Sequence, residues 1–266
     1  MRRGRFNFRK ANASVALRDF WSPSDLAGIG LQLWLDAGDR STITADEMGL
    51  VQQWRDKSGF ARHASQANPA DSPLYSATGW RGSRPAILFG SATSEFMVSA
   101  NFGVPSSAWD FFAVYRHDHT AIATHGFLRN NAGTTIVPIG WQSDVSTNVF
   151  RVNNTNDPAG LEAYRNGSAT PLSRTRANFF DKLTTVESPN GVLVRYGALG
   201  WTVSTAIERI GNNGSWGVHG PICEIVAVSS SISAADKQRI EGYLAHRWMT
   251  GAELDAAHPY RTSPPL

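Results

Sequence analysis

The stretch that most constrains the fold is residues 207–248, where the hydrophobic period changes from that of strands to that of a helix. Residues 206–211 alternate apolar and polar side chains and end in a turn-rich Gly-Asn-Asn-Gly run. Residues 221–228 form an apolar run rich in β-branched side chains, which predicts a buried strand. After residue 233 the apolar residues recur at the spacing of a helix. The change predicts two core strands and then one helix.

The predicted helix has a clear start and a clear buried face. Ser233 stands three residues before Asp236, an arrangement that caps the first turn of a helix. Apolar residues then recur at spacings of three and four, which places them on one face: Ile240, Tyr243, Leu244 and Trp248. We expect a helix over about 233–249 that packs by this face on the outside of a β-sandwich. Its polar residues, Glu241 among them, are expected in water.

Composition favours one large all-β domain. The chain has 266 residues, of which 41% are hydrophobic and 18% charged, so it can bury a sizeable core. Its 24 glycines and 13 prolines fit many turns between short strands. Cys223 is the single cysteine, which excludes an internal disulfide, and its apolar neighbours indicate a buried, inert thiol. No apolar run approaches the ~20 residues that span a bilayer, so no membrane contact is expected.

Positive charge is concentrated before the body of the chain. Six of the 25 basic residues precede Asp19, the first acid, which leaves 19 basic residues against 22 acidic ones. We expect residues 1–21 to form a basic aromatic arm and residues 22–266 to form a single domain. The arm would dock on a neighbouring subunit or an acidic partner through Arg2, Arg3, Arg5, Phe6, Phe8, Arg9 and Lys10. A solvated tail and an organellar transit peptide are alternatives on composition. Nucleic acid is disfavoured, because a globular binder carries its basic patch on the fold itself.

The aromatic residues suggest a binding surface. Four of the nine tryptophans lie in expected strands or on the helix face and are assigned to the core: Trp34, Trp54, Trp109 and Trp248. The remaining ones considered lie near loops: Trp80, Trp141, Trp201 and Trp216, with Trp80 on a long surface loop over 68–84. The densest polar and aromatic group consists of Asn212, Asn213, Trp216 and His219. It fits a sugar-binding groove or a subunit interface, and equally a turn that closes the sandwich edge.

Metal ions have two candidate positions, and neither is favoured. Asp36 and Asp56 offer the carboxylate oxygens that calcium takes, but no run of closely spaced acids accompanies them, so backbone capping explains them better. Three histidines, His117, His119 and His125, have partial transition-metal spacing. Hydrogen-bonded loop histidines are the favoured interpretation. No metal or cofactor is expected.

A catalytic pattern is missing from the sequence. Glycosidases of this shape place carboxylates at alternate positions on one strand, and the chain has no such set. Glu208 and Glu224 could face one another only if their two strands pair. We therefore predict no catalytic residues and a protein that is not an enzyme, with a glycoside hydrolase as the least favoured alternative.

Several motifs carry a resemblance to a known family. They are Leu33-Trp-Leu-Asp-Ala37, Trp54-Arg-Asp-Lys-Ser-Gly59, Arg84-Pro-Ala-Ile-Leu-Phe-Gly90, Ile240-Glu-Gly-Tyr-Leu-Ala-His-Arg-Trp248 and His258-Pro-Tyr260. Over about residues 31–260 the chain resembles concanavalin A-like, laminin-G-like jelly-roll domains. The resemblance implies an all-β, two-sheet antiparallel jelly-roll sandwich with one C-terminal amphipathic helix packed on it. Many relatives continue with Phe-Asp-Gly where this chain has Phe89-Gly-Ser, which weakens any metal site carried over from the family.

The resemblance also implies a function, because such domains are common in bacteriophage virion proteins and bacterial surface proteins. The leading expectation is a phage virion structural protein, such as a capsid decoration, head spike or tail-fibre component. It would be a homo-oligomer held to other virion proteins by its arm, with contact to host-surface glycan. The alternative is a bacterial lectin-like module at the cell surface that binds carbohydrate. Since folds host many functions, the site must decide between them.

Overall fold

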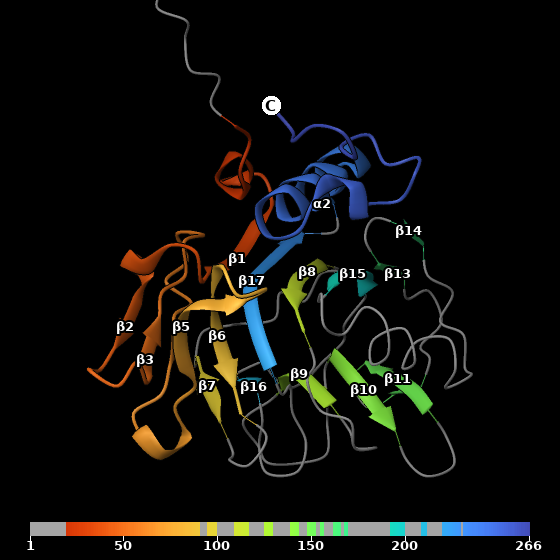
Figure 1. Ribbon diagram of the computed structural model, residues 1–266. Helices are drawn as coiled ribbons and strands as arrows, with labels where there is room; N and C mark the ends of the chain where they lie inside the picture. The colour runs from red at the N-terminus through yellow and green to blue at the C-terminus, as the bar shows by residue number, and fades with distance from the viewer. Residues whose placement is uncertain are drawn as a thin grey trace, which may run out of the picture.

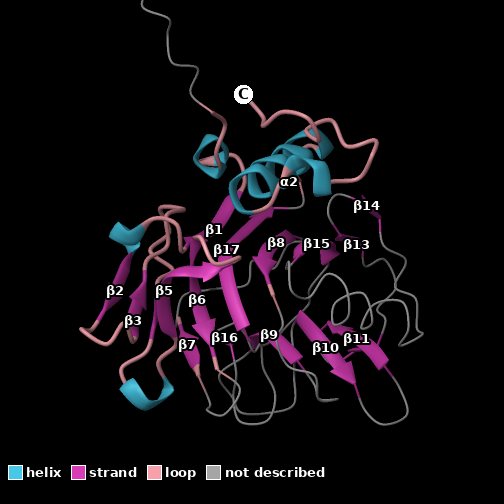
Figure 2. Cartoon of the chain, viewed as in Figure 1, coloured by secondary structure: helices cyan, strands magenta, loops and turns pink. Residues whose placement is uncertain are grey.

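The computed structural model describes residues 20–90, 95–99, 109–116, 125–129, 139–143, 148–152, 155–156, 162–165, 168–169, 192–199, 209–211, 220–229 and 231–266. Strands dominate these residues, and Figure 2 shows them as two groups of arrows with the helices above and at the edges. The fold is mostly β, with two antiparallel sheets and one long helix. This much of the predicted architecture is confirmed and is consistent with an all-β sandwich.

The first sheet has eight strands, and one of them is the last strand of the chain, which the long helix follows. Its order is β14-β13-β15-β8-β17-β6-β5, with β1 added beside β17. The bounds are β1 Leu31–Asp36, β5 Leu74–Trp80, β6 Arg84–Phe89, β8 Trp109–Tyr115, β13 Glu162–Arg165, β14 Ser168–Ala169, β15 Val192–Leu199 and β17 Gly220–Ser229.

The second sheet has nine strands in the order β12-β11-β10-β9-β16-β7-β4-β3-β2. Its bounds are β2 Ile43–Ala45, β3 Val51–Trp54, β4 Ala64–Ser65, β7 Phe96–Val98, β9 His125–Arg129, β10 Ile139–Ser143, β11 Asn148–Val152, β12 Thr155–Asn156 and β16 Arg209–Gly211. Short 3-10 helices connect elements at η1 Pro23–Leu26, η2 Arg40–Thr42, η3 Pro69–Asp71 and η6 Gly251–Glu253.

Strand β17 is the centre of the first sheet. One of its edges pairs with β8 along nearly the whole strand, and the other pairs with β6 in its first part and β1 in its second. Nine of its ten residues are buried. A strand buried on both faces reads as a continuous apolar run, which is why residues 221–228 predicted it.

The helix α2, Ala234–Trp248, packs against a face of this sheet, at the top of the view in Figure 1. The Ser233 side chain accepts a hydrogen bond from the Asp236 amide, as the capping pattern predicted. Ile240, Leu244 and Trp248 are buried against a cluster that includes Trp34 and Phe112. The predicted helix, its cap and its apolar face are confirmed. Within the described part of the chain, no helix is long and apolar enough to cross a membrane.

Two predictions about this region are wrong. Residues 68–84 are not a surface loop, because β5 pairs there with β6 and buries Trp80, whose indole N–H donates to the Trp248 carbonyl. Glu241 is not in water: it is 1% exposed and lies 3.1 Å from His258. Glu208, the residue considered as a partner of Glu224, lies outside the described residues, so that pairing is untested.

Candidate functional site

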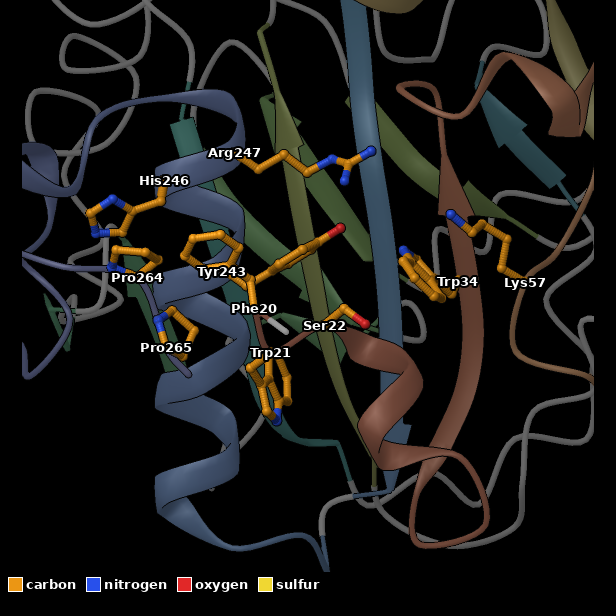
Figure 3. Close-up of a pocket in the computed structure, with 10 residues that line it drawn as sticks. All are labelled: Phe20, Trp21, Ser22, Trp34, Lys57, Tyr243, His246, Arg247, Pro264 and Pro265. Carbon is orange, nitrogen blue, oxygen red and sulfur yellow. The ribbon is translucent and has the colours of Figure 1, made fainter. Parts of the chain in front are cut away.

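A pocket of about 410 Å³ opens between α2 and the strand β1. Its walls come from four separate parts of the chain: the segment before η1, β1 with the loop after β3, the last turns of α2, and the C-terminal tail. Figure 3 shows their side chains converging on one space. The lining residues are Phe20, Trp21, Ser22, Trp34, Lys57, Tyr243, His246, Arg247, Pro264 and Pro265.

Two buried carboxylates lie beneath this pocket. Asp36 at the end of β1 and Glu224 on β17 are direct partners in the antiparallel pairing of these strands, and both are fully buried. Opposed residues on neighbouring strands have their Cβ atoms only about 5 Å apart, so two like charges there repel each other. Such a pair persists only where other groups compensate the charge.

Two cations from different elements provide that compensation. The guanidinium of Arg247, on the last turn of α2, donates through Nη2 to both Asp36 oxygens at 2.8 and 2.9 Å, and its Nε lies 3.3 Å from Glu224. Lys57 Nζ lies 2.9 Å from both Asp36 and Asp39. Burial alone would lower the pKa of Lys57, but the charge of Asp36 and the hydrogen bonds to both carboxylates outweigh it, so that pKa is raised.

The surroundings of Glu224 shift the pKa of its carboxyl group. Trp34 Nε1 donates to one of its oxygens at 2.6 Å, and Trp248 Nε1 donates to the other. Burial, and then the charge of Asp36, raise the pKa of Glu224 to about 7, although Arg247 and the two indoles act in the opposite direction. Near neutral pH this carboxyl therefore exchanges a proton.

The aromatic wall of the pocket is built from both sides of the helix–sheet junction. Tyr243 meets Trp21 edge to face at a centroid distance of 6.3 Å. Burial, and then the charge of Glu224, raise the pKa of the Tyr243 hydroxyl. Phe20 is 68% exposed at the rim, while Lys57 Nζ covers the Trp34 ring at 4.1 Å. The pocket thus combines aromatic faces with fixed hydrogen-bond donors, as sites for small polar ligands do.

The residues that the sequence nominated for ligand binding cannot be compared with this pocket. Asn212, Asn213, Trp216 and His219 lie outside the described residues, as do the arm residues from Arg2 to Lys10. Glu208, His117 and His119 also lie outside them. Those expectations stay predictions.

The two aspartates weighed for calcium have other partners. Asp56 accepts hydrogen bonds from the backbone amides of Trp34, Ser58 and Arg62, so the capping interpretation is confirmed. Asp36 is engaged by Lys57 and Arg247. Among the described side chains, no three His, Cys, Asp or Glu residues gather as a metal site would require.

Sequence reasoning missed most of the pocket. The helical spacing predicts only that Tyr243 lies on the helix face, and no local pattern marks Arg247, Lys57, Pro264 or Pro265 as site residues. One signal was present: Asp36 and Glu224 are acids inside apolar strands, and a buried acid needs a partner. The identity of that partner could not be read, because Arg247 is 211 residues from Asp36 in sequence.

Comparison with known proteins finds only distant structural similarity. No family model matches the chain, and no curated protein matches it. Among solved structures it is similar to Trypanosoma rangeli sialidase in complex with sialic acid, with a TM-score of 0.42 and 11% identity over 83% of this chain and 33% of that one. A second Trypanosoma rangeli sialidase structure gives a TM-score of 0.37 and 12% identity over the same shares. The chain spans about a third of the length of these enzymes.

These neighbours require one correction. They are sialidases, which are glycoside hydrolases, so the prediction that the protein is not an enzyme is contradicted and is withdrawn. A likeness at this TM-score assigns neither an activity nor a substrate to the present chain. No phage protein or concanavalin A-like protein is among these neighbours.

Proposed function

We propose that the protein is a carbohydrate-binding β-sandwich protein and that the pocket between α2 and β1 is its sugar site. The carrying observation is the lining of that pocket, where six aromatic or proline side chains stand beside four hydrogen-bonding ones. Sugars present an apolar ring face and a rim of hydroxyls, so they need this combination. The volume of about 410 Å³ falls within the range of small-molecule sites.

A glycan array with the full chain tests this proposal. Phe20 is an exposed aromatic residue at the rim, so Phe20→Ala should weaken binding about tenfold without affecting the fold, in line with about 1.4 kcal/mol. Phe60 is a matched control, since it is an exposed aromatic residue that does not line the pocket. Phe60→Ala should bind as the wild type does. Absence of binding to every glycan on a broad array would overturn the proposal.

A second proposal concerns attachment: the protein is a virion structural component whose jelly-roll body is held by residues 1–21. It is supported by the motif resemblance and by the charge distribution, with six positive charges before Asp19 and a net negative remainder. Deleting residues 1–18, which spares Trp21 in the core, should leave the body folded and abolish incorporation into particles. Normal incorporation would remove the arm from this role and favour the lectin-like module at a bacterial surface.

A further inference from the structure

The charge of the pocket wall has one sign. Three lining residues can carry charge, namely Lys57, His246 and Arg247, and all three are basic. Of the acids that balance two of them, Asp36 and Glu224 are fully buried behind the wall, while Asp39, which pairs with Lys57, is a third exposed and does not line the pocket. Among the residues that line the pocket, a ligand therefore meets basic groups and no carboxylate.

The two cations facing the ligand are fixed in position. Arg247 is held through Nη2 and Nε by the two buried acids, and its side chain remains a third exposed. Its Nη1 makes no hydrogen bond to the described residues. Lys57 uses two hydrogen bonds, to Asp36 and Asp39, of the three that an ammonium can donate. Each cation thus keeps a donor for a ligand at no further ordering cost.

We propose that the sugar bound in this pocket carries a carboxylate, which Arg247 and Lys57 recognise while its ring lies against Phe20 and Tyr243. This inference rests on the proposed function and names the substrate class of the same site. A guanidinium and an ammonium both suit a carboxylate, and the guanidinium presents a planar edge to it. The chain's own residues 1–18 are a poor occupant, because they carry six positive charges and no acid.

The buried acid behind Arg247 makes this recognition depend on pH. Around Glu224 stand Asp36 from β1, Arg247 and Tyr243 from α2, and Lys57 beyond Asp36, with His246 on the wall. An ionised Glu224 repels an incoming carboxylate, whereas a protonated Glu224 leaves Arg247 with one fewer competing anion. Since the pKa of Glu224 is about 7, an acidic sugar should bind more tightly as the pH falls through that value. A neutral sugar should gain nothing from this group.

Calorimetry with the full chain tests the inference against three acidic probes: trigalacturonate, a hyaluronan tetrasaccharide and sialyllactose. Each is paired with its methyl-esterified form, which keeps the sugar and removes the charge. We expect at least one acid to bind about tenfold more tightly than its ester, equivalent to about 1.4 kcal/mol. Its affinity should rise from about pH 8 to about pH 6 while that of the ester stays level. Lys57→Gln, checked for folding by circular dichroism, should abolish the preference.

The outcomes separate the two proposals. Esters or other neutral glycans that bind as tightly as the acids, with loss in Phe20→Ala, would overturn the acidic-sugar inference and leave the sugar site in place. Absence of binding by every acid, ester and array glycan would overturn both. The comparison of acid with ester and its pH profile use the wild-type protein, so they decide the inference even if Lys57→Gln fails to fold.

Discussion

Two buried acid–base groupings lie against the same helix, and they differ in what closes them from solvent. Glu241 and His258 join α2 to the tail, and both side chains are 1% exposed. Asp36 and Glu224 are equally buried, but their cations Lys57 and Arg247 are 23% and 33% exposed on the pocket wall. The first grouping is sealed on every side. In the second grouping Asp36 and Glu224 are buried while Lys57 and Arg247 are partly exposed, so its positive charge is accessible to a ligand.

Among the predicted changes, removal of the Arg247 side chain should lower the unfolding free energy most. Arg247→Ala leaves the opposed Asp36 and Glu224 buried without their shared partner, which costs about 3 kcal/mol of unfolding free energy. Denaturant unfolding measures the loss, and lower pH should restore part of it by protonating Glu224. Arg239→Ala is the matched control, because Arg239 forms an exposed pair with Asp236 and should cost under about 0.5 kcal/mol. Equal losses in the two variants would contradict the assigned role of Arg247.

Proton binding by Glu224 should have the next largest effect on the unfolding free energy, and this effect depends on pH. The folded pKa of about 7 is raised above the ordinary 4.5, so the stability that this group contributes is fully present below about pH 4.5 and is lost as pH rises through 7. Relative to Glu224→Gln, the wild type should lose about 2–3 kcal/mol of unfolding free energy across that window. Urea titrations of both proteins at several pH values measure the difference. If the unfolding free energy of the wild type minus that of Glu224→Gln stays constant or increases as the pH rises, the raised pKa of Glu224 is contradicted.

A substitution next to the Glu241–His258 pair should have the smallest effect on the unfolding free energy. The sign of that effect shows whether the tail is packed tightly against α2. A Cβ at Gly242 would lie 2.5 Å from the Tyr260 Cβ and would push the tail away from α2. Alanine inside a helix normally adds about 1 kcal/mol relative to glycine, so Gly242→Ala tests whether the clash prevails. We expect a net loss of about 1 kcal/mol and faster proteolysis of residues 256–266. A more stable variant would mean that the tail is not clamped there.

Local pattern predicted the elements of the fold far better than the site. Ser233 and the Ile240, Leu244 and Trp248 stripe located the helix, because caps and periodicity are written within a few residues. Trp80 was misplaced because its segment is rich in Pro, Ser and Gly, and only pairing with β6 makes it a buried strand. The stripe also misplaced Glu241, since a helix face that looks polar can be covered by a tail.

The pocket depends on contacts that periodicity does not encode. Trp34 and Glu224 are 190 residues apart, and no local rule indicates that an indole of β1 donates to a carboxylate of β17. The sequence did show acids within apolar strands, which marks a place where a cation must come from elsewhere. Only the three-dimensional arrangement shows that this cation also faces a cavity.

The tail that covers α2 also has a practical consequence for work on the protein. Pro264 and Pro265 form part of the pocket wall, and the residue after them, Leu266, is 60% exposed. Any affinity tag fused after Leu266 would emerge at the mouth of the cavity and could compete with whatever enters it. An environment-sensitive dye at the same position would instead report ligand entry directly, through a change in its fluorescence.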